Sequence, residues 1–121
     1  MSALFRVFEK KNGEIREIYD EQSISGDVYM AVFDYIDECD IIFNFLQNFN
    51  GNAESYALEI LPEQARQALQ VLEEGKSAAD ELSDDWGYSV ADILYGIKIL
   101  TGYFEKLVLQ TEISVLIFEI Y

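Results

Sequence analysis

The sequence contains no histidine, and among its 121 residues it has a single cysteine, Cys39. Without histidine the chain lacks the commonest general base and the commonest transition-metal ligand, and it cannot form a Ser-His or Cys-His nucleophile pair. One cysteine cannot build a disulfide framework or a structural zinc site. None of the seven glycines fits a GxGxxG or Walker phosphate loop. We therefore expect a protein that is not an enzyme and that uses no cofactor and no metal ion.

Positive charge is also scarce, because 8 Lys and Arg stand against 23 Asp and Glu, for a formal net charge of -15. Between Arg16 and Arg66 there is no basic residue, yet that interval holds eleven acidic ones. Affinity for nucleic acid comes largely from bases that neutralise phosphates, so we expect no direct nucleic-acid contact and no binding to anionic membranes. A generic soluble surface mixes charges of both signs. The base-free interval favours a protein partner with a basic surface, and solubility alone is the alternative.

Long apolar runs are missing as well, and no stretch approaches the length that spans a bilayer. The acidic Glu9 follows too soon after the N-terminus for a signal peptide, so the expected location is the cytoplasm. On the other hand, 50% of the residues are hydrophobic and 14% are aromatic. That composition is typical of a folded protein with a core, and we expect a single domain over residues 1–121.

The stretch from Asp27 to Phe49 has the clearest helical pattern in the chain. Its apolar residues alternate steps of four and three, which places them on one stripe of a helix: Val28, Val32, Tyr35, Cys39, Ile42, Leu46 and Phe49. Asp27 is a favoured N-cap residue, and the sequence Asn50-Gly51-Asn52 suits a helix exit. The pattern predicts one helix over residues 27–49, with Cys39 buried as a small hydrophobe.

The N-terminal region carries the strongest hairpin signal, because residues 3–9 and 14–19 flank Asn12-Gly13. A type I′ turn needs positive φ at both central residues, which this dipeptide tolerates. With this two-residue loop, complementary side chains face each other across the strands in the pairs Lys11–Glu14, Glu9–Arg16 and Val7–Ile18. The sequence therefore predicts an antiparallel hairpin.

The second half of the chain reads as two helices and a terminal strand. Residues 55–61 fit either a short strand or a helical turn. Pro62 suits a first helical position, and this helix either ends or weakens at Gly75. Residues 80–88 form an acidic loop or a helix end. Ser89 has capping spacing before a helix with the repeat Ile93, Ile97, Leu100, Phe104 and Leu107.

The last eleven residues, 111–121, are rich in β-branched side chains that alternate, which predicts a C-terminal strand; a buried helix is the alternative. The expected fold class is α+β. The N-terminal hairpin, extended or not by the C-terminal strand, packs on three to four amphipathic helices. A nearly all-α bundle is the alternative if residues 111–121 prolong the last helix.

Two stretches combine apolar and acidic side chains in a way that is typical of binding patches. On the expected helix over residues 27–49, the side chains opposite the stripe are Met30, Phe33, Asp34, Asp37, Glu38, Asp40, Ile41 and Phe45. The second stretch contains Asp84, Asp85, Trp86 and Tyr88. Large apolar anchors ringed by carboxylates would bind a basic partner, whereas the alternative is that the apolar members lie in the core. The carboxylates supply too few ligands for a tight calcium site.

These features favour a non-enzymatic inhibitor or immunity-type protein, antitoxin-like, that blocks a basic surface of a partner protein. A nuclease toxin or another nucleic-acid-processing effector would be such a partner, and mimicry of DNA is one version of this hypothesis. The alternative is a self-associating structural or scaffold domain that forms a homodimer through its apolar patches. A carboxylate-dependent metal binder or enzyme is the third and weakest hypothesis.

Overall fold

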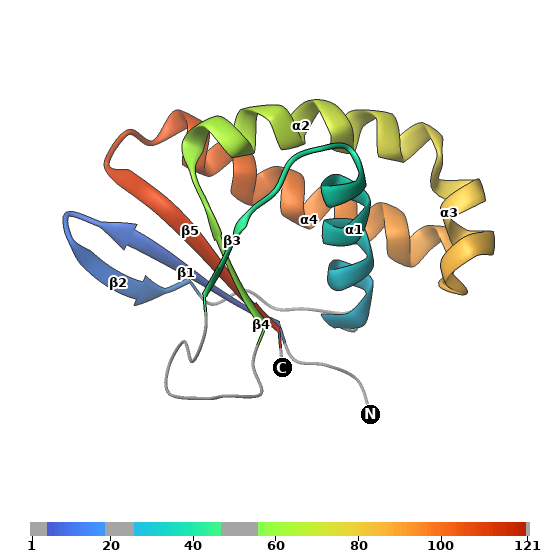
Figure 1. Cartoon of the computed structure of the whole chain (residues 1–121), viewed down its shortest axis with the longest axis horizontal. Coiled ribbons are helices and arrows are strands. Elements are labelled where there is room, and N and C mark those ends of the chain that lie inside the picture. The colour runs from blue at the N-terminus through green and yellow to red at the C-terminus, as the bar shows by residue number, and fades with distance from the viewer. Residues whose placement is uncertain (1–4, 19–25, 47–55, 121) are drawn as a thin grey trace.

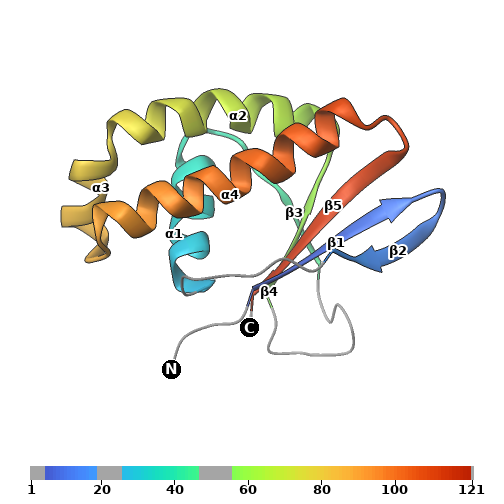
Figure 2. The ribbon, with the colours of Figure 1, turned by 180° about the vertical axis from the view of Figure 1, so that it is seen from behind.

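The computed structural model describes residues 5–18, 26–46 and 56–120. In chain order its elements are β1 (Phe5–Lys11), β2 (Glu14–Glu17), α1 (Gly26–Glu38), β3 (Asn44–Leu46), β4 (Tyr56–Ile60), α2 (Pro62–Ser77), α3 (Ala79–Trp86), α4 (Val90–Leu109) and β5 (Ile113–Ile120). The strands form an antiparallel sheet in the order β2-β1-β5-β4-β3. The helices gather on one side of this sheet (Figure 1; Figure 2). The predicted α+β fold class is confirmed, including the hairpin and the C-terminal strand.

The β1–β2 hairpin closes through the turn that the sequence predicts. Asn12 has φ 54° and Gly13 has φ 81°, so both central residues adopt the left-handed conformation of a type I′ turn. The observed register pairs Lys11 with Glu14 and Glu9 with Arg16. The backbone N–H of Ile18 donates to the carbonyl oxygen of Val7 over 2.8 Å. The local turn chemistry therefore sets this register correctly.

The predicted helix over residues 27–49 is wrong in its second half, because α1 ends at Glu38. The amides of Cys39 and Asp40 donate to carbonyl oxygens three residues back, and Asp40 then takes a φ of 68°. Residues Asn44–Leu46 form β3 against β4 instead of further helical turns. The short, almost continuous apolar run over residues 41–46 suits a strand, and pairing with β4 supplies backbone partners there. Phe49 and Asn50-Gly51-Asn52 lie outside the described residues.

The buried face of α1 is also turned relative to the predicted stripe. The structure buries Val28, Tyr29, Val32, Phe33 and Ile36. Tyr35 is half-buried, and Cys39 is exposed, so the prediction of a buried Cys39 is wrong. Ile42, which the stripe also placed in the core, is 73% exposed because the chain has already left the helix.

The main core lies between the helices and the sheet, and Phe118 of β5 is at its centre. The ring of Phe118 makes edge contacts with Phe33 of α1 at 5.2 Å and with Tyr103 and Phe104 of α4, both at 5.8 Å between ring centroids. Such aromatic contacts stabilise a core beyond the area that they bury. All five residues of the predicted α4 repeat are buried here: Ile93, Ile97, Leu100, Phe104 and Leu107. The central strand thus ties α1 to α4.

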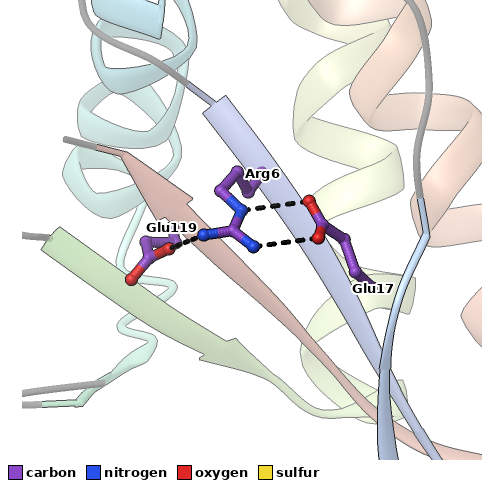
Figure 3. A network of polar contacts seen from close by, with 3 residues as sticks. All are labelled: Arg6, Glu17 and Glu119. Atoms are coloured by element: carbon purple, nitrogen blue, oxygen red, sulfur yellow. Dashed lines mark hydrogen bonds and ion pairs between the residues drawn. The ribbon is translucent and has the colours of Figure 1, made fainter. Parts of the chain in front are cut away.

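Side chains alternate along each strand, so the sheet also has a second face. Phe8, Ala57, Val115 and Ile117 form a separate buried cluster there, away from the helices. Figure 3 shows a polar contact network formed by Arg6 of β1, Glu17 of β2 and Glu119 of β5. Arg6 shares its strand face with Phe8, and its guanidinium lies 5.0 Å from the centre of that ring. Both faces of β5 are therefore buried.

Unlike the C-terminal end of α1, the ends of α2, α3 and α4 follow sequence signals closely. Residues Tyr56–Ile60 are a strand, which resolves the two readings of that stretch, and Pro62 is the first residue of α2. The helix continues past Gly75 to Ser77, and the acidic segment that follows is α3, which ends where Gly87 takes a φ of 77°. The Ser89 hydroxyl accepts a hydrogen bond from the Asp92 amide at 3.1 Å, as its capping position predicts.

Candidate functional site

The exposed side of α1 carries three of the six carboxylates that the sequence singles out. Asp34, Asp37 and Glu38 are exposed on the helix, and Asp40 is exposed just beyond its end. Residues three and four apart lie on the same helix surface, so Asp34 is a neighbour of Asp37 and Glu38. Partial burial raises the pKa of Asp34, and the negative charge of Asp37 raises it further. In the part of the chain that the structure describes, no Lys or Arg forms an ion pair with these carboxylates.

Tyr35 lies on α1 to one side of these carboxylates and joins α1 to two other helices. Its ring contacts the Trp86 ring of α3, with centroids 6.5 Å apart and ring planes at 70°. It also packs closely on α2, since a Cβ added to Gly75 would lie 3.2 Å from Cε1 of Tyr35. The contact between Tyr35 and Trp86 therefore brings Trp86 of the second predicted patch next to α1.

A further carboxylate, Glu74 of α2, completes this surface. Burial raises the pKa of the Cys39 thiol, and the charges of Glu74, Glu38 and Asp40 raise it further, in that order. Burial also raises the pKa of the Tyr35 hydroxyl, followed by the effects of Cys39 and Glu74. Glu74 therefore lies beside the end of α1. A thiol held in its protonated form by surrounding acids is a poor nucleophile, so Cys39 does not suggest thiolate chemistry.

We call this region the acidic–aromatic surface. It consists of two half-buried rings and of exposed carboxylates from α1, its C-terminal end and α2: Asp34, Tyr35, Asp37, Glu38, Asp40, Glu74 and Trp86. The role of Glu74 was not predicted from the sequence. Its only signal there is its acidic side chain next to Gly75, and its place beside α1 depends on how the two helices pack.

Two of the predicted anchor residues are not available to a partner. Phe33 is 3% exposed and Ile41 is 6% exposed, so the expectation that they project from the surface is wrong. Both belong to the main core, because the buried face of α1 includes Phe33 and the turn after the helix directs Ile41 inward. Met30 is half-buried and packs against that core.

The remaining predicted residues lie on α3, just after it, and on the edge strand β3. Asp84 and Asp85 are exposed on α3, and Tyr88 is half-buried beyond its end. The Ser83 hydroxyl donates to the Tyr88 carbonyl oxygen at 2.6 Å and fixes this end of the helix. Phe45 is 49% exposed, but it belongs to β3 and not to α1.

A second group of exposed apolar side chains surrounds that edge strand. Ile42 is 73% exposed and Leu61 is 38% exposed. The Gln64 side-chain amide donates to the Ile42 carbonyl oxygen at 3.0 Å and accepts from the Leu61 amide at 2.9 Å, so both residues lie next to the start of α2. Ile42 and Leu61 are therefore close to each other, and Phe45 is a further exposed apolar side chain on β3.

The other kinds of site have less support in the described residues. No group of three or more Cys, Asp or Glu among them is placed to hold a metal ion. None of the helices that can be described is long and apolar enough to cross a membrane.

No protein-family model, no curated protein sequence and no solved structure matches this chain.

Proposed function

We propose that this chain is a non-enzymatic acidic inhibitor of the immunity or antitoxin type, acting in the cytoplasm. It would bind and block a basic surface of a partner protein, such as a nuclease toxin or another nucleic-acid-processing effector. The observation that supports this proposal is the acidic–aromatic surface, where carboxylates from α1 and α2 surround the Tyr35–Trp86 contact. No ion pair neutralises those carboxylates within the described residues.

The two kinds of side chain on this surface would have different tasks in binding. The carboxylates attract a basic partner over a distance and speed its association, since complementary charge acts mainly on the rate of encounter. The half-buried rings of Tyr35 and Trp86 offer apolar contact and a face on which a guanidinium or ammonium group can stack. Binding of a cation would also relieve the repulsion between Asp34 and Asp37.

The test uses a protein captured from the host lysate, whose association rate with the purified chain is then measured by stopped flow. We expect the rate constant to fall at least about tenfold when salt rises from about 50 mM to about 500 mM, because screening removes the steering. The variant with Asp34→Asn, Asp37→Asn, Glu38→Gln and Asp40→Asn should associate slowly at low salt. An association rate that does not depend on salt would contradict the proposal.

A matched control separates a focused surface from general charge. The variant with Glu14→Gln, Asp80→Asn, Glu81→Gln and Glu105→Gln also removes four exposed carboxylates that form no ion pair within the described residues, but none of them belongs to the acidic–aromatic surface. We expect this control to keep most of the association rate. Equal losses in the two variants would mean that only net charge matters.

A self-associating domain is the second candidate, and the exposed apolar side chains Ile42, Phe45 and Leu61 at the β3 edge of the sheet favour it. A homodimer built on this edge would bury these side chains between two copies. Light scattering at high protein concentration distinguishes the two candidates. A monomer would exclude self-association, whereas a stable dimer that Ile42→Ser and Phe45→Ser together convert to a monomer would support it.

A further inference from the structure

Helix α4 contains a glycine that no packing contact requires. Gly102 lies well inside α4 and is exposed. A Cβ added to it would meet nothing within 4 Å among the described residues, whereas one added to Gly75 would press on Tyr35. Glycine weakens a helix interior relative to alanine, so its presence at an open position calls for another reason.

Gly102 lies in a hollow of about 240 Å³ on the α4 surface. The described residues that line it are Lys98, Ile99, Gly102, Tyr103 and Lys106. Lys98, Gly102 and Lys106 are four residues apart, so they follow one line along the helix, and the glycine leaves a gap between the two lysines. Half-buried Ile99 and buried Tyr103 give this hollow an apolar wall.

Two lysines line this hollow although the chain is strongly acidic. The Nζ of Lys106 lies 3.4 Å from the Glu9 carboxylate of β1, which is 8% exposed. Arg16 of β2 is directly opposite Glu9 in the hairpin, and so it is on the same face of the sheet. Lys98 is exposed and has no ion pair in the part of the chain that the structure describes. One positive charge beside the hollow is thus not neutralised.

We propose that this hollow binds a small amphipathic anion, namely an apolar ring or short chain with a single acidic group. The acidic group pairs with the ammonium of Lys98, and the apolar part lies over Gly102 against Ile99 and Tyr103. On the other side of Gly102, Lys106 is already paired with Glu9. The volume of 240 Å³ suits a molecule of the size of a substituted benzene. This proposal does not depend on the inhibitor proposal, because the two sites involve different helices. Helix α4 is in front in Figure 2, whereas α1 is in front in the opposite view of Figure 1.

The test compares three ligands of nearly equal shape, which are benzoate, benzyl alcohol and protonated benzylamine. Each is titrated into the ¹⁵N-labelled protein, and the amide shifts of residues 98–106 are followed by NMR. The net charge of -15 favours benzylamine over the molecule as a whole, so a preference for benzoate at α4 must come from the local lysines. We expect saturable shifts with benzoate, with a dissociation constant of about 1 mM or tighter, and much weaker shifts with the other two.

Variants locate the ligand and test its charge. Lys98→Gln should weaken benzoate binding about threefold to fivefold, which is the usual effect of one exposed ion pair. Lys76→Gln is the matched control, because Lys76 lies on α2 and pairs with Glu73, and it should leave binding unchanged. Gly102→Leu should abolish binding because the side chain fills the hollow, while it strengthens the helix and so preserves the fold.

Three outcomes would overturn the proposal. The first is the absence of saturable shifts in residues 98–106 with benzoate. The second is equal binding of benzoate and benzyl alcohol, which would show that the hollow is apolar only. The third is an unchanged benzoate affinity in Lys98→Gln. A failure of the inhibitor proposal would appear in the partner kinetics and would leave all these shifts unaffected.

Discussion

Two glycines inside helices differ in whether their surroundings leave room for a side chain. A Cβ at Gly75 would lie 3.2 Å from Cε1 of Tyr35 and 3.5 Å from Cδ1 of Ile97, so it would fit only if the Tyr35 ring moved. At Gly102 the same added atom would meet none of the described residues within 4 Å. Gly75 therefore permits α1 and α2 to approach each other at Tyr35, whereas Gly102 only leaves a surface open.

Alanine at these two positions should therefore have different effects. We expect Gly102→Ala to raise the free energy of unfolding by about 0.5–1 kcal/mol, the usual gain of alanine over glycine in a helix interior. Gly75→Ala should gain clearly less than Gly102→Ala, or lose stability, and should shift the emission of Trp86, the only tryptophan, because the displaced Tyr35 ring contacts it. Urea unfolding and tryptophan fluorescence measure both effects. Equal gains with unchanged emission would contradict the close packing at Gly75.

The sequence predicts individual residues well where the signal is local. The Asn12-Gly13 turn, the Ser89 cap and the α4 repeat are all found as expected. The buried face of α1 was predicted less well, because apolar residues surround much of this helix. Two faces of this helix are apolar enough to be buried, one through Val32 and Cys39 and one through Val32 and Phe33. Packing against the rest of the core buries the face with Phe33.

At the scale of whole elements, pairing between distant segments determines whether a segment is a helix or a strand where its local sequence pattern fits both. Residues after Asp40 continue an apolar rhythm that a helix could also use, but the structure pairs Asn44–Leu46 with β4. The sequence of residues 27–49 alone does not predict pairing with β4. The same limit applies to the acidic–aromatic surface. Its carboxylates on α1 and Trp86 were predicted in separate stretches, Tyr35 was predicted on the buried stripe, and only the packing of Tyr35 on α2 and α3 joins them.

The Arg6 network links three strands across the second face of the sheet (Figure 3). Arg6 donates two hydrogen bonds to Glu17, at 3.0 and 2.8 Å, and lies 3.6 Å from the Glu119 carboxylate, which is 1% exposed. The hydrogen bonds from Arg6 hold the pKa of Glu17 below its usual 4.5, against a smaller opposing effect of burial, and the charge of Arg6 lowers it further. A carboxylate with a lowered pKa adds stability above pH 4.5 that is lost as the pH falls through the folded-state value.

Removal of Arg6 should destabilise the fold, because the buried carboxylate of Glu119 would lose its cation. We expect Arg6→Gln to lower the free energy of unfolding by about 3–5 kcal/mol, because Glu119 remains buried and unpaired. Adding Glu119→Gln to that variant should recover most of the loss. Arg16→Gln, on the exposed strand β2, should change stability by less than about 0.5 kcal/mol. If Arg6→Gln costs no more than Arg16→Gln in urea unfolding, the network does not stabilise the sheet.

For the whole molecule, the dominant physical fact is the net charge of -15 on a folded chain. Repulsion among like charges lowers the stability of the compact state, and salt weakens that repulsion. Part of the repulsion is at the acidic–aromatic surface, where burial raises the pKa of Asp34 and the charge of Asp37 raises it further. The same carboxylates would therefore both destabilise the free protein and attract a basic partner.

This double role predicts opposite effects of salt on stability and on binding. Between about 20 mM and about 500 mM NaCl, the free energy of unfolding should rise because repulsion is screened, while the association rate with a basic partner should fall. The variant with Asp34→Asn, Asp37→Asn, Glu38→Gln and Asp40→Asn should be more stable than the natural sequence at low salt and should respond less to added salt. Urea unfolding at a series of salt concentrations measures this response. If the variant and the natural sequence show the same salt dependence, the repulsion is spread over the molecule, and the acidic–aromatic surface has no special electrostatic role.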